Sequence, residues 1–189
     1  QDSRFLEIEK YVSMRETMRA SLLQLIISGE CEFSLDEELF DLDYPGHYFR
    51  VIKTIDVAIR VSGNLDIGPT QTINATLTQL GSKALVEPNF DAVRYLFGEG
   101  DEQPDPSVLR VNWRSNQQIA ISKLVTNEGE SGDDGMFVLN FFLDDRYFPF
   151  EGTGAVSRWK LDMPLENNRK LLIREENAQV LAIEDVVIH

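Results

Sequence analysis

The sequence predicts a mainly β protein, an antiparallel β-sandwich preceded by one or two short N-terminal helices. Three observations lead to this fold class. Apolar and polar residues alternate over several segments after Glu30, turn-forming residues separate these segments, and no segment of helix length lies between them. Strands joined by short turns pair antiparallel and pack as two sheets, whereas a parallel α/β fold would need a helix between successive strands.

The first part of the chain has a different pattern. Apolar residues fall at helical spacing over residues 5–12 and again over residues 18–26, just before Gly29, a residue type that commonly ends helices. Lys and Arg do not dominate the polar side, so the stripe is typical of a packing face rather than of a helix lying on a membrane. Since the chain begins with Gln1, we expect residues 1–29 to be the helical tail of a larger parent chain, followed by a sandwich domain over residues 30–189.

The alternating pattern predicts seven or eight strands. The clearest cover residues 55–61 and 72–78, and the same period of two recurs at residues 109–113, 119–121, 137–143, 155–163 and 181–188. The turn Asp43-Tyr44-Pro45-Gly46 lies just ahead of the long strand that is expected from Phe49. In that turn Pro presets φ and Gly supplies a positive φ. Two polar loops rich in Gly, at residues 97–106 and 128–135, are expected to be mobile.

The charge of the chain narrows the class of partner. Among 189 residues, 18 Lys and Arg face 32 Asp and Glu, which gives a formal net charge of -14. Such an excess disfavours binding to nucleic acid or to anionic lipid. Acidic residues concentrate in residues 30–43, 99–105 and 128–134, which hold no Lys or Arg. Such runs are usually solvated faces, although docking on a basic partner or weak binding of cations stays open.

Signatures of catalysis are scarce. His47 is the only histidine away from the chain end, and its aromatic, turn-like surroundings favour a structural imidazole bonded to backbone. Asp41, Asp43 and His47 could imitate a metal triad, but these ligands would straddle the proline turn. We therefore expect no catalytic residue, no cofactor and no metal site.

The single cysteine does not change that expectation. Cys31 has no second cysteine with which to form an internal disulfide. The neighbouring carboxylates of Glu30 and Glu32 would raise the pKa of its thiol, which disfavours a nucleophilic thiolate.

Several motifs carry a resemblance to a known family. They are FDLDYPGHYFRVIK at residues 40–53, GMFVLNF at 135–141, and DRYFPFEGTGA at 145–155 followed by SRW at 157–159, with supporting segments at 68–78 and 184–189. In order and spacing these motifs resemble the C-terminal, TcB-binding domain of the A component (TcA) of the insecticidal Tc toxin complexes. The likeness runs from about Cys31 to the end, but residues 86–105 and 165–179 have no counterpart in that pattern.

The resemblance implies a function as well as a fold. In that family the domain is a β-sandwich at the C-terminus of a very large, secreted chain that assembles as a homopentamer around a translocation channel. It implies no catalytic activity and no direct membrane contact by this domain. Docking would instead occur on the β-propeller of the TcB component in a TcB–TcC cocoon, and would open the propeller gate so that the toxic enzyme can enter the channel.

The resemblance transfers no contact residues, so the predicted contacts come from the acidic loops and one aromatic segment. They are Glu99, Asp101, Glu102, Asp133, Asp134, Tyr147 and Phe148. Trp159 and Phe150, which belong to the matching motifs, are interpreted as core residues. An alternative function is a glycan-binding or cell-surface-binding sandwich, since such folds often present aromatic loops to sugars. A glycosidase would require two carboxylates facing each other across a cleft.

Overall fold

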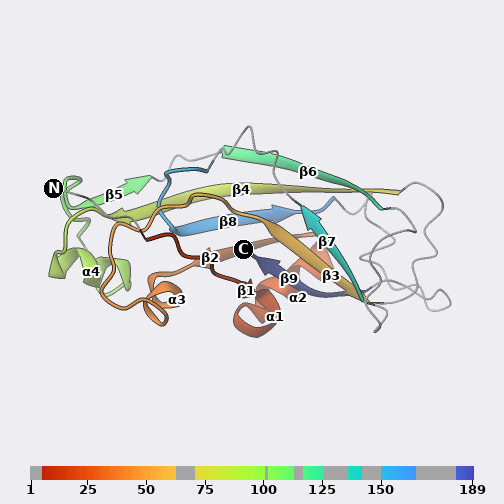
Figure 1. Cartoon of the computed structure of the whole chain (residues 1–189), viewed down its shortest axis with the longest axis horizontal. Helices are drawn as coiled ribbons and strands as arrows, with labels where there is room; N and C mark the ends of the chain where they lie inside the picture. The colour runs from red at the N-terminus through yellow and green to blue at the C-terminus, as the bar shows by residue number, and fades with distance from the viewer. Residues whose placement is uncertain are drawn as a thin grey trace.

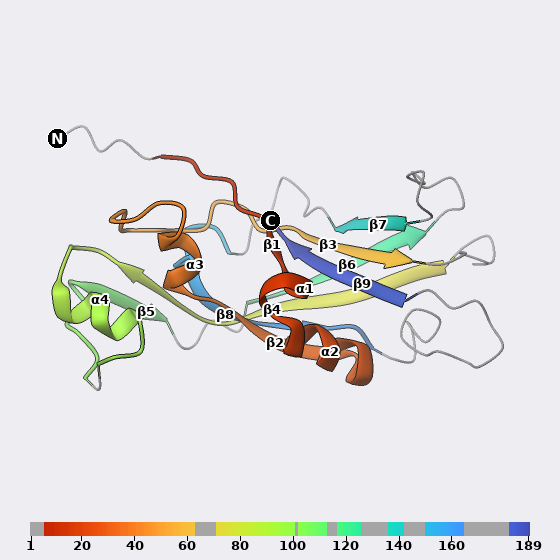
Figure 2. The same cartoon turned by 90° about the horizontal axis from the view of Figure 1, so that it is seen from below.

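The computed structural model describes residues 6–62, 71–100, 102–112, 117–125, 136–141, 150–164 and 182–189. Over these residues the strands form two antiparallel sheets, which lie as two layers (Figure 1 and Figure 2). The mainly β fold predicted from the alternation is confirmed. One sheet has the order β1 (Val12–Ser13), β9 (Ala182–Ile188), β3 (Val57–Ser62) and β7 (Met136–Phe141). The other has the order β2 (Glu30–Leu35), β8 (Val156–Asp162), β4 (Gln71–Leu85) and β5 (Leu109–Asn112), and β6 (Gln117–Val125) also pairs with β4.

The main core lies between the two sheets. The first sheet contributes Ile59 and Val186, and the second contributes Leu77 and Trp159, all of which are buried. Alternation along each strand places these side chains on the inner face of the sheet. The expectation that Trp159 and Phe150 belong to the core is confirmed, because both are buried and their rings meet edge to face with centroids 4.8 Å apart.

Two short helices, α1 (Met14–Thr17) and α2 (Arg19–Ser28), precede β2, and Gly29 ends α2 with a φ of 79°. Their buried residues Met14, Leu22 and Leu25 lie in the same core as the sheets. The helix expected over residues 5–12 is wrong for the described part of that segment. Residues 6–11 have no regular secondary structure, and Val12–Ser13 pairs with β9. Pairing with a strand from the far end of the chain overrides the local helical spacing here.

The sequence has no segment of helix length between the strands, but two shorter helices lie there. A one-turn helix, α3 (Glu37–Asp41), follows β2, and α4 (Phe90–Leu96) follows β4. Both are too short for a period of 3.6 to be visible in the sequence. The signal for α4 is its cap, because the Asn89 side chain accepts a hydrogen bond from Ala92 N at 3.1 Å, as helix N-caps do.

The strand expected from Phe49 begins only at Val57. Phe49 has a φ of 56°, a left-handed conformation that is rare for a bulky residue, and Val51 forms only an isolated bridge with Gly154. The turn itself behaves as predicted, since Gly46 has a φ of 77°. The predicted loop at 128–135 and the ends of the strands predicted at 109–113 and 137–143 lie outside the described residues.

Candidate partner-binding surface

The described residues include only two of the predicted contacts, Glu99 and Glu102. Both are exposed and follow α4 at one end of the molecule. The other five, Asp101, Asp133, Asp134, Tyr147 and Phe148, lie outside the described residues. The surface is therefore built from Glu99, Glu102 and the residues around them.

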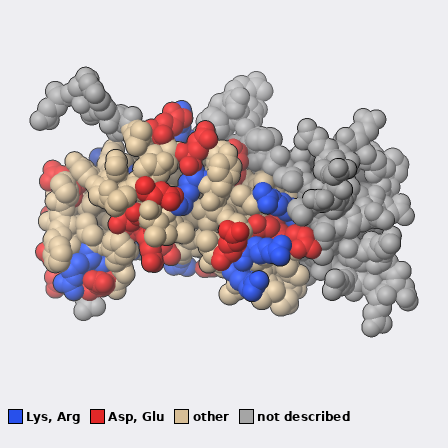
Figure 3. Space-filling model, turned by 60° about the horizontal axis from the view of Figure 1, so that its bottom comes forward, with Lys and Arg blue, Asp and Glu red and all other residues tan. Residues whose placement is uncertain are grey.

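The acidic run at residues 30–43 forms ion pairs within the chain. Its pairs are Glu30 with Lys160 (2.6 Å), Glu32 with Arg158 (3.1 Å), Glu37 and Asp41 with Arg50, and Asp43 with Lys10. The bond to Glu30 raises the pKa of Lys160. Figure 3 shows Lys and Arg interspersed among Asp and Glu on the described face that it draws. This run therefore does not present an unbroken negative field to a basic partner.

Arg50 fastens α3 to the turn that follows it. One terminal nitrogen of its guanidinium donates to Glu37, and the other donates to Asp41 Oδ1 at 3.1 Å and to the carbonyl of Tyr44 at 2.8 Å. The planar fork of arginine suits this arrangement, in which one side chain holds three acceptors. Burial raises the pKa of Glu37, although the positive charge of Arg50 opposes the rise. Within the family motif at residues 40–53, Arg50 thus has a structural role.

Two of the family motifs pair with each other. Residues 50–52 bond to residues 152–155 through Ile52 N to Thr153 O (2.8 Å), Gly152 N to Ile52 O (2.8 Å) and Ala155 N to Arg50 O (3.0 Å). Gly154 also permits close approach to β4, because a Cβ at this position would lie 2.0 Å from the carbonyl oxygen of Lys83. Residues 50–52 and 152–155 of these motifs therefore have a role in folding.

The outer surface of α4 has a different character. Phe90, Arg94 and Phe97 are spaced i, i+4 and i+7 and so lie along one side of the helix. Phe90 is 76% exposed and Phe97 is 43% exposed. Glu99 contacts Arg94 in two ways. The Glu99 carbonyl accepts a hydrogen bond from Arg94 Nη2 at 3.2 Å, and the Glu99 carboxylate lies 3.8 Å from Arg94 Nε. We call Phe90, Arg94, Phe97, Glu99 and Glu102 the α4 face.

The inner side of α4 fixes the position of this face. Ala92 and Leu96 are buried in a second, smaller apolar cluster with Leu85 of β4, Leu109 of β5 and Val156 of β8. Phe40 of α3 packs against both this cluster and the main core. The Lys83 ammonium lies 4.7 Å from the centre of the Tyr95 ring and joins β4 to α4. The helix is thus held to the rigid sheets.

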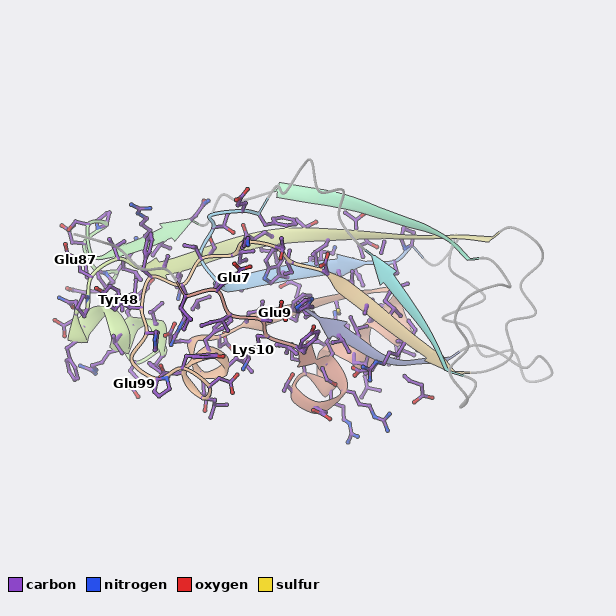
Figure 4. The ribbon with its side chains drawn as sticks, in the orientation of Figure 1. Glu7, Glu9, Lys10, Tyr48, Glu87 and Glu99 are labelled. Carbon is purple, nitrogen blue, oxygen red and sulfur yellow. The ribbon has the colours of Figure 1, made fainter. Side chains whose placement is uncertain are left out.

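An exposed aromatic residue of the loop after α3 lies at the same end as α4. Figure 4 shows Tyr48, Glu87 and Glu99 together at this end of the molecule. Tyr48 lines a shallow hollow with Arg50, Lys83 and Leu85, of about 180 Å³ including its open mouth. That volume is below the roughly 300–1,000 Å³ of pockets that bury small molecules. The geometry at this end suits contact with another macromolecule better than enclosure of a small ligand.

The residues considered for catalysis or metal binding, Cys31, Asp41 and Asp43, have structural roles. Cys31 is 1% exposed, and burial raises the pKa of its thiol to about 12. The cause is therefore burial and not the neighbouring carboxylates of Glu30 and Glu32. Asp41 and Asp43 are engaged by Arg50 and Lys10. Among the described residues, no three His, Cys, Asp or Glu side chains gather as a metal site would require.

The contacts predicted from the sequence include Glu99 and Glu102 of the α4 face, because both lie in an acidic loop, but not Phe90 and Phe97. Their spacing of seven residues after the cap residue Asn89 is the signal that could have revealed them.

Comparisons with known proteins place the chain in a wider context. The family model described as "Tc toxin complex TcA C-terminal TcB-binding domain" matches residues 1–189. The toxin subunit YenA2 of Yersinia entomophaga is 33% identical over 165 residues, which cover 85% of this chain and 11% of that subunit. The chain thus spans only a small part of the length of this relative. No solved structure matches the chain significantly. None of the described helices is long and apolar enough to cross a membrane.

Proposed function

Because the chain belongs to the family of TcA C-terminal TcB-binding domains, we propose that it docks on the β-propeller of a TcB component and that docking opens the propeller gate. The match of the family model over the whole chain carries this proposal. The match supports the assignment of the chain as a TcB-binding domain of a Tc toxin subunit. In the proposed function the docking site is the β-propeller of a TcB–TcC cocoon, and gate opening is the result.

The structure supports a docking role through its rigidity. The sheets enclose a buried core, and Arg50 and the paired motifs fix the loops at the α4 end. A rigid surface loses little conformational entropy on binding, so more of the contact energy remains as affinity. The ionisable side chains described above are used in ion pairs and caps rather than converging on a substrate-sized cleft.

Gate opening sets an energetic requirement on the docking. Contact can shift the propeller towards an open form only if the domain binds that form more tightly than the closed one. A shift from 1:99 to 99:1 requires a difference of about 5.5 kcal/mol between the two affinities. An interface that includes a few aromatic anchors can supply a difference of this size.

In the parent subunit we assign residues 1–29 to the tail of a helical region, whose strand β1 and helices α1 and α2 pack into the docking sandwich of residues 30–189. Asp185 of β9 accepts hydrogen bonds from Ser13 Oγ at 2.6 Å and from Arg15 N at 2.9 Å. The ring of Tyr11 also stacks on His189 with centroids 4.1 Å apart. These contacts support a rigid join, which would hold the sandwich in place at the mouth of a homopentameric channel in a secreted toxin complex, without touching the membrane itself.

Co-elution with the partner tests the proposal. The 189-residue chain is mixed with a purified TcB–TcC cocoon and passed over a size-exclusion column, and release of the enclosed toxic protein is followed in parallel. We expect a stoichiometric complex and release that depends on the chain. If the two proteins elute apart, the docking function is wrong, and binding to a sugar array without TcB would favour the glycan-binding alternative. A stable complex without release would remove only the gating step.

A further inference from the structure

We propose that the α4 face is the surface by which this chain contacts TcB, and that it fits a partner surface in which an apolar pocket is flanked by Lys and Arg. The inference deepens the TcB-binding function proposed above and rests on it. It assigns the contact to α4 and to Phe97, Glu99 and Glu102 after it, and it names the chemistry of the complementary site.

The first argument is the exposure of two aromatic rings on one side of one helix. Phe90 and Phe97 lie two turns apart with Arg94 between them, and Phe90 is among the most exposed large apolar residues of the described chain. Phenylalanine and arginine are enriched in the centres of protein interfaces. An aromatic ring that stays exposed to water contributes no burial energy to the fold. Two rings at this spacing could enter one groove or two adjacent pockets.

The second argument is that the face is held in place before any partner arrives. The Asn89 cap and the buried Ala92 and Leu96 fix the helix. Beyond its end, Glu99 N donates to the carbonyl of Arg94 at 2.9 Å, while the Arg94 side chain donates back to the Glu99 carbonyl. These bonds hold the Arg94 guanidinium against Glu99, just beyond the end of α4, so binding would cost little further ordering of this side chain.

The third argument is the charge around the rings. The described residues 87–100 and 102–112 hold five carboxylates and two arginines, and one of these arginines, Arg94, is paired with Glu99. A negative rim around aromatic residues is complementary to a pocket that carries cationic side chains at its edge. Such a rim would also speed the encounter with a positively charged surface, in a manner that weakens as salt rises.

The strongest competing surface is the outer side of α2, where Ile27 is 77% exposed and Leu23 is also exposed. Residues 20–28 contain no charged residue, so α2 is apolar on both its sides. A helix that is apolar on all sides is typical of one that is permanently buried against other protein, because permanent interfaces have the apolar composition of a domain core. Docking between separate components instead favours aromatic and arginine residues with a polar rim, which is the composition of the α4 face.

The test compares two equally exposed apolar residues on different surfaces. Phe90→Ser and Phe97→Ser remove the rings of the α4 face, and Ile27→Ser is the matched control on α2. Dissociation constants for the purified TcB component are measured by interferometry, and urea unfolding checks that each variant is folded. We expect Phe90→Ser to weaken binding about 30-fold, as for an interface hot spot, and Ile27→Ser to stay within about twofold of the wild type.

A charge variant adds an independent readout. Glu102→Lys should slow association and flatten its dependence on salt, since it reverses one charge of the rim without touching the rings. The proposal is overturned if Phe90→Ser combined with Phe97→Ser binds TcB like the wild type, or if Ile27→Ser alone weakens binding. In both cases the wild type still binds, so the docking function stands. A wild-type chain that does not bind TcB would refute the function and this inference together.

Discussion

Trp159→Ala is the sharpest test of the sandwich core. Trp159 lies on β8 opposite Phe33 of β2 and opposite Gln79 of β4, so its ring occupies the middle of one sheet. The side chain is completely buried, its ring meets that of Phe150, and its Nε1 donates to Ser157 Oγ at 2.7 Å. The substitution removes all of these contacts at once and leaves a cavity between the sheets.

The expected loss follows from the size of that cavity. Replacing a buried Trp by Ala typically costs about 3–5 kcal/mol. The aromatic pair with Phe150 adds about 0.5–1.5 kcal/mol beyond its buried area, and the indole hydrogen bond contributes about 1 kcal/mol, in part within the same total. We therefore expect a loss of about 4 kcal/mol, a large share of the roughly 5–15 kcal/mol by which domains of this kind are stable.

Urea unfolding followed by circular dichroism measures this loss in the 189-residue chain. Trp159→Phe is the control, because it keeps an aromatic ring in the site and loses only part of the volume and the hydrogen bond donor. It should cost about 1–2 kcal/mol. A loss below about 1 kcal/mol for Trp159→Ala, the range of surface substitutions, would refute the assignment of this ring to the core.

Three further predictions test single features of the fold. Gly154→Ala should lower the free energy of unfolding in urea by about 2–4 kcal/mol, because its Cβ would lie 2.0 Å from the Lys83 carbonyl oxygen. Wild-type stability would mean that residue 154 can move away from β4 at no cost. Asp185→Ala should cost about 1–3 kcal/mol and speed proteolysis before β2, since Ser13 loses a buried acceptor, and an unchanged digestion pattern would contradict the rigid join. Burial raises the pKa of Cys31 to about 12, so the folded chain keeps a proton that the unfolded thiol loses above its ordinary value of 9.0. Stability should therefore fall with pH between about 9 and 12 by up to about 1.4 kcal/mol per unit, and Cys31→Ala should remove that part of the slope; equal slopes would show an ordinary thiol pKa.

Local patterns in the sequence predicted the strands because side-chain alternation is a property of neighbouring residues. The period of two around Ile59, Leu77 and Trp159 requires one buried face, wherever the partner strand comes from. Turn chemistry is equally local, which is why Gly29 and Gly46 adopt the positive φ that their positions predicted. The motifs that resemble the TcA family are also continuous in the chain, and their order was readable without the structure.

Two of the wrong predictions concern contacts with distant segments of the chain. Val12 pairs with Ile188 of β9 instead of continuing a helix. The strand expected from Phe49 begins only at Val57, because residues 50–52 form hydrogen bonds with residues 152–155, far along the chain. Helix α4 was missed because seven residues carry too little periodicity to be seen against the surrounding strands.

The sequence by itself determined a mainly β, acidic domain with a helical lead-in, a buried Trp159 and a family of docking proteins. Only the tertiary structure decided which carboxylates are neutralised and which aromatic rings remain exposed. Arg158 and Lys160 reach the acidic run at residues 30–43 across large separations in the chain, whereas Phe90 and Phe97 find no covering partner among the described residues. Charge and apolarity belong to single residues, but whether either faces a partner depends on which distant segments the fold brings next to it.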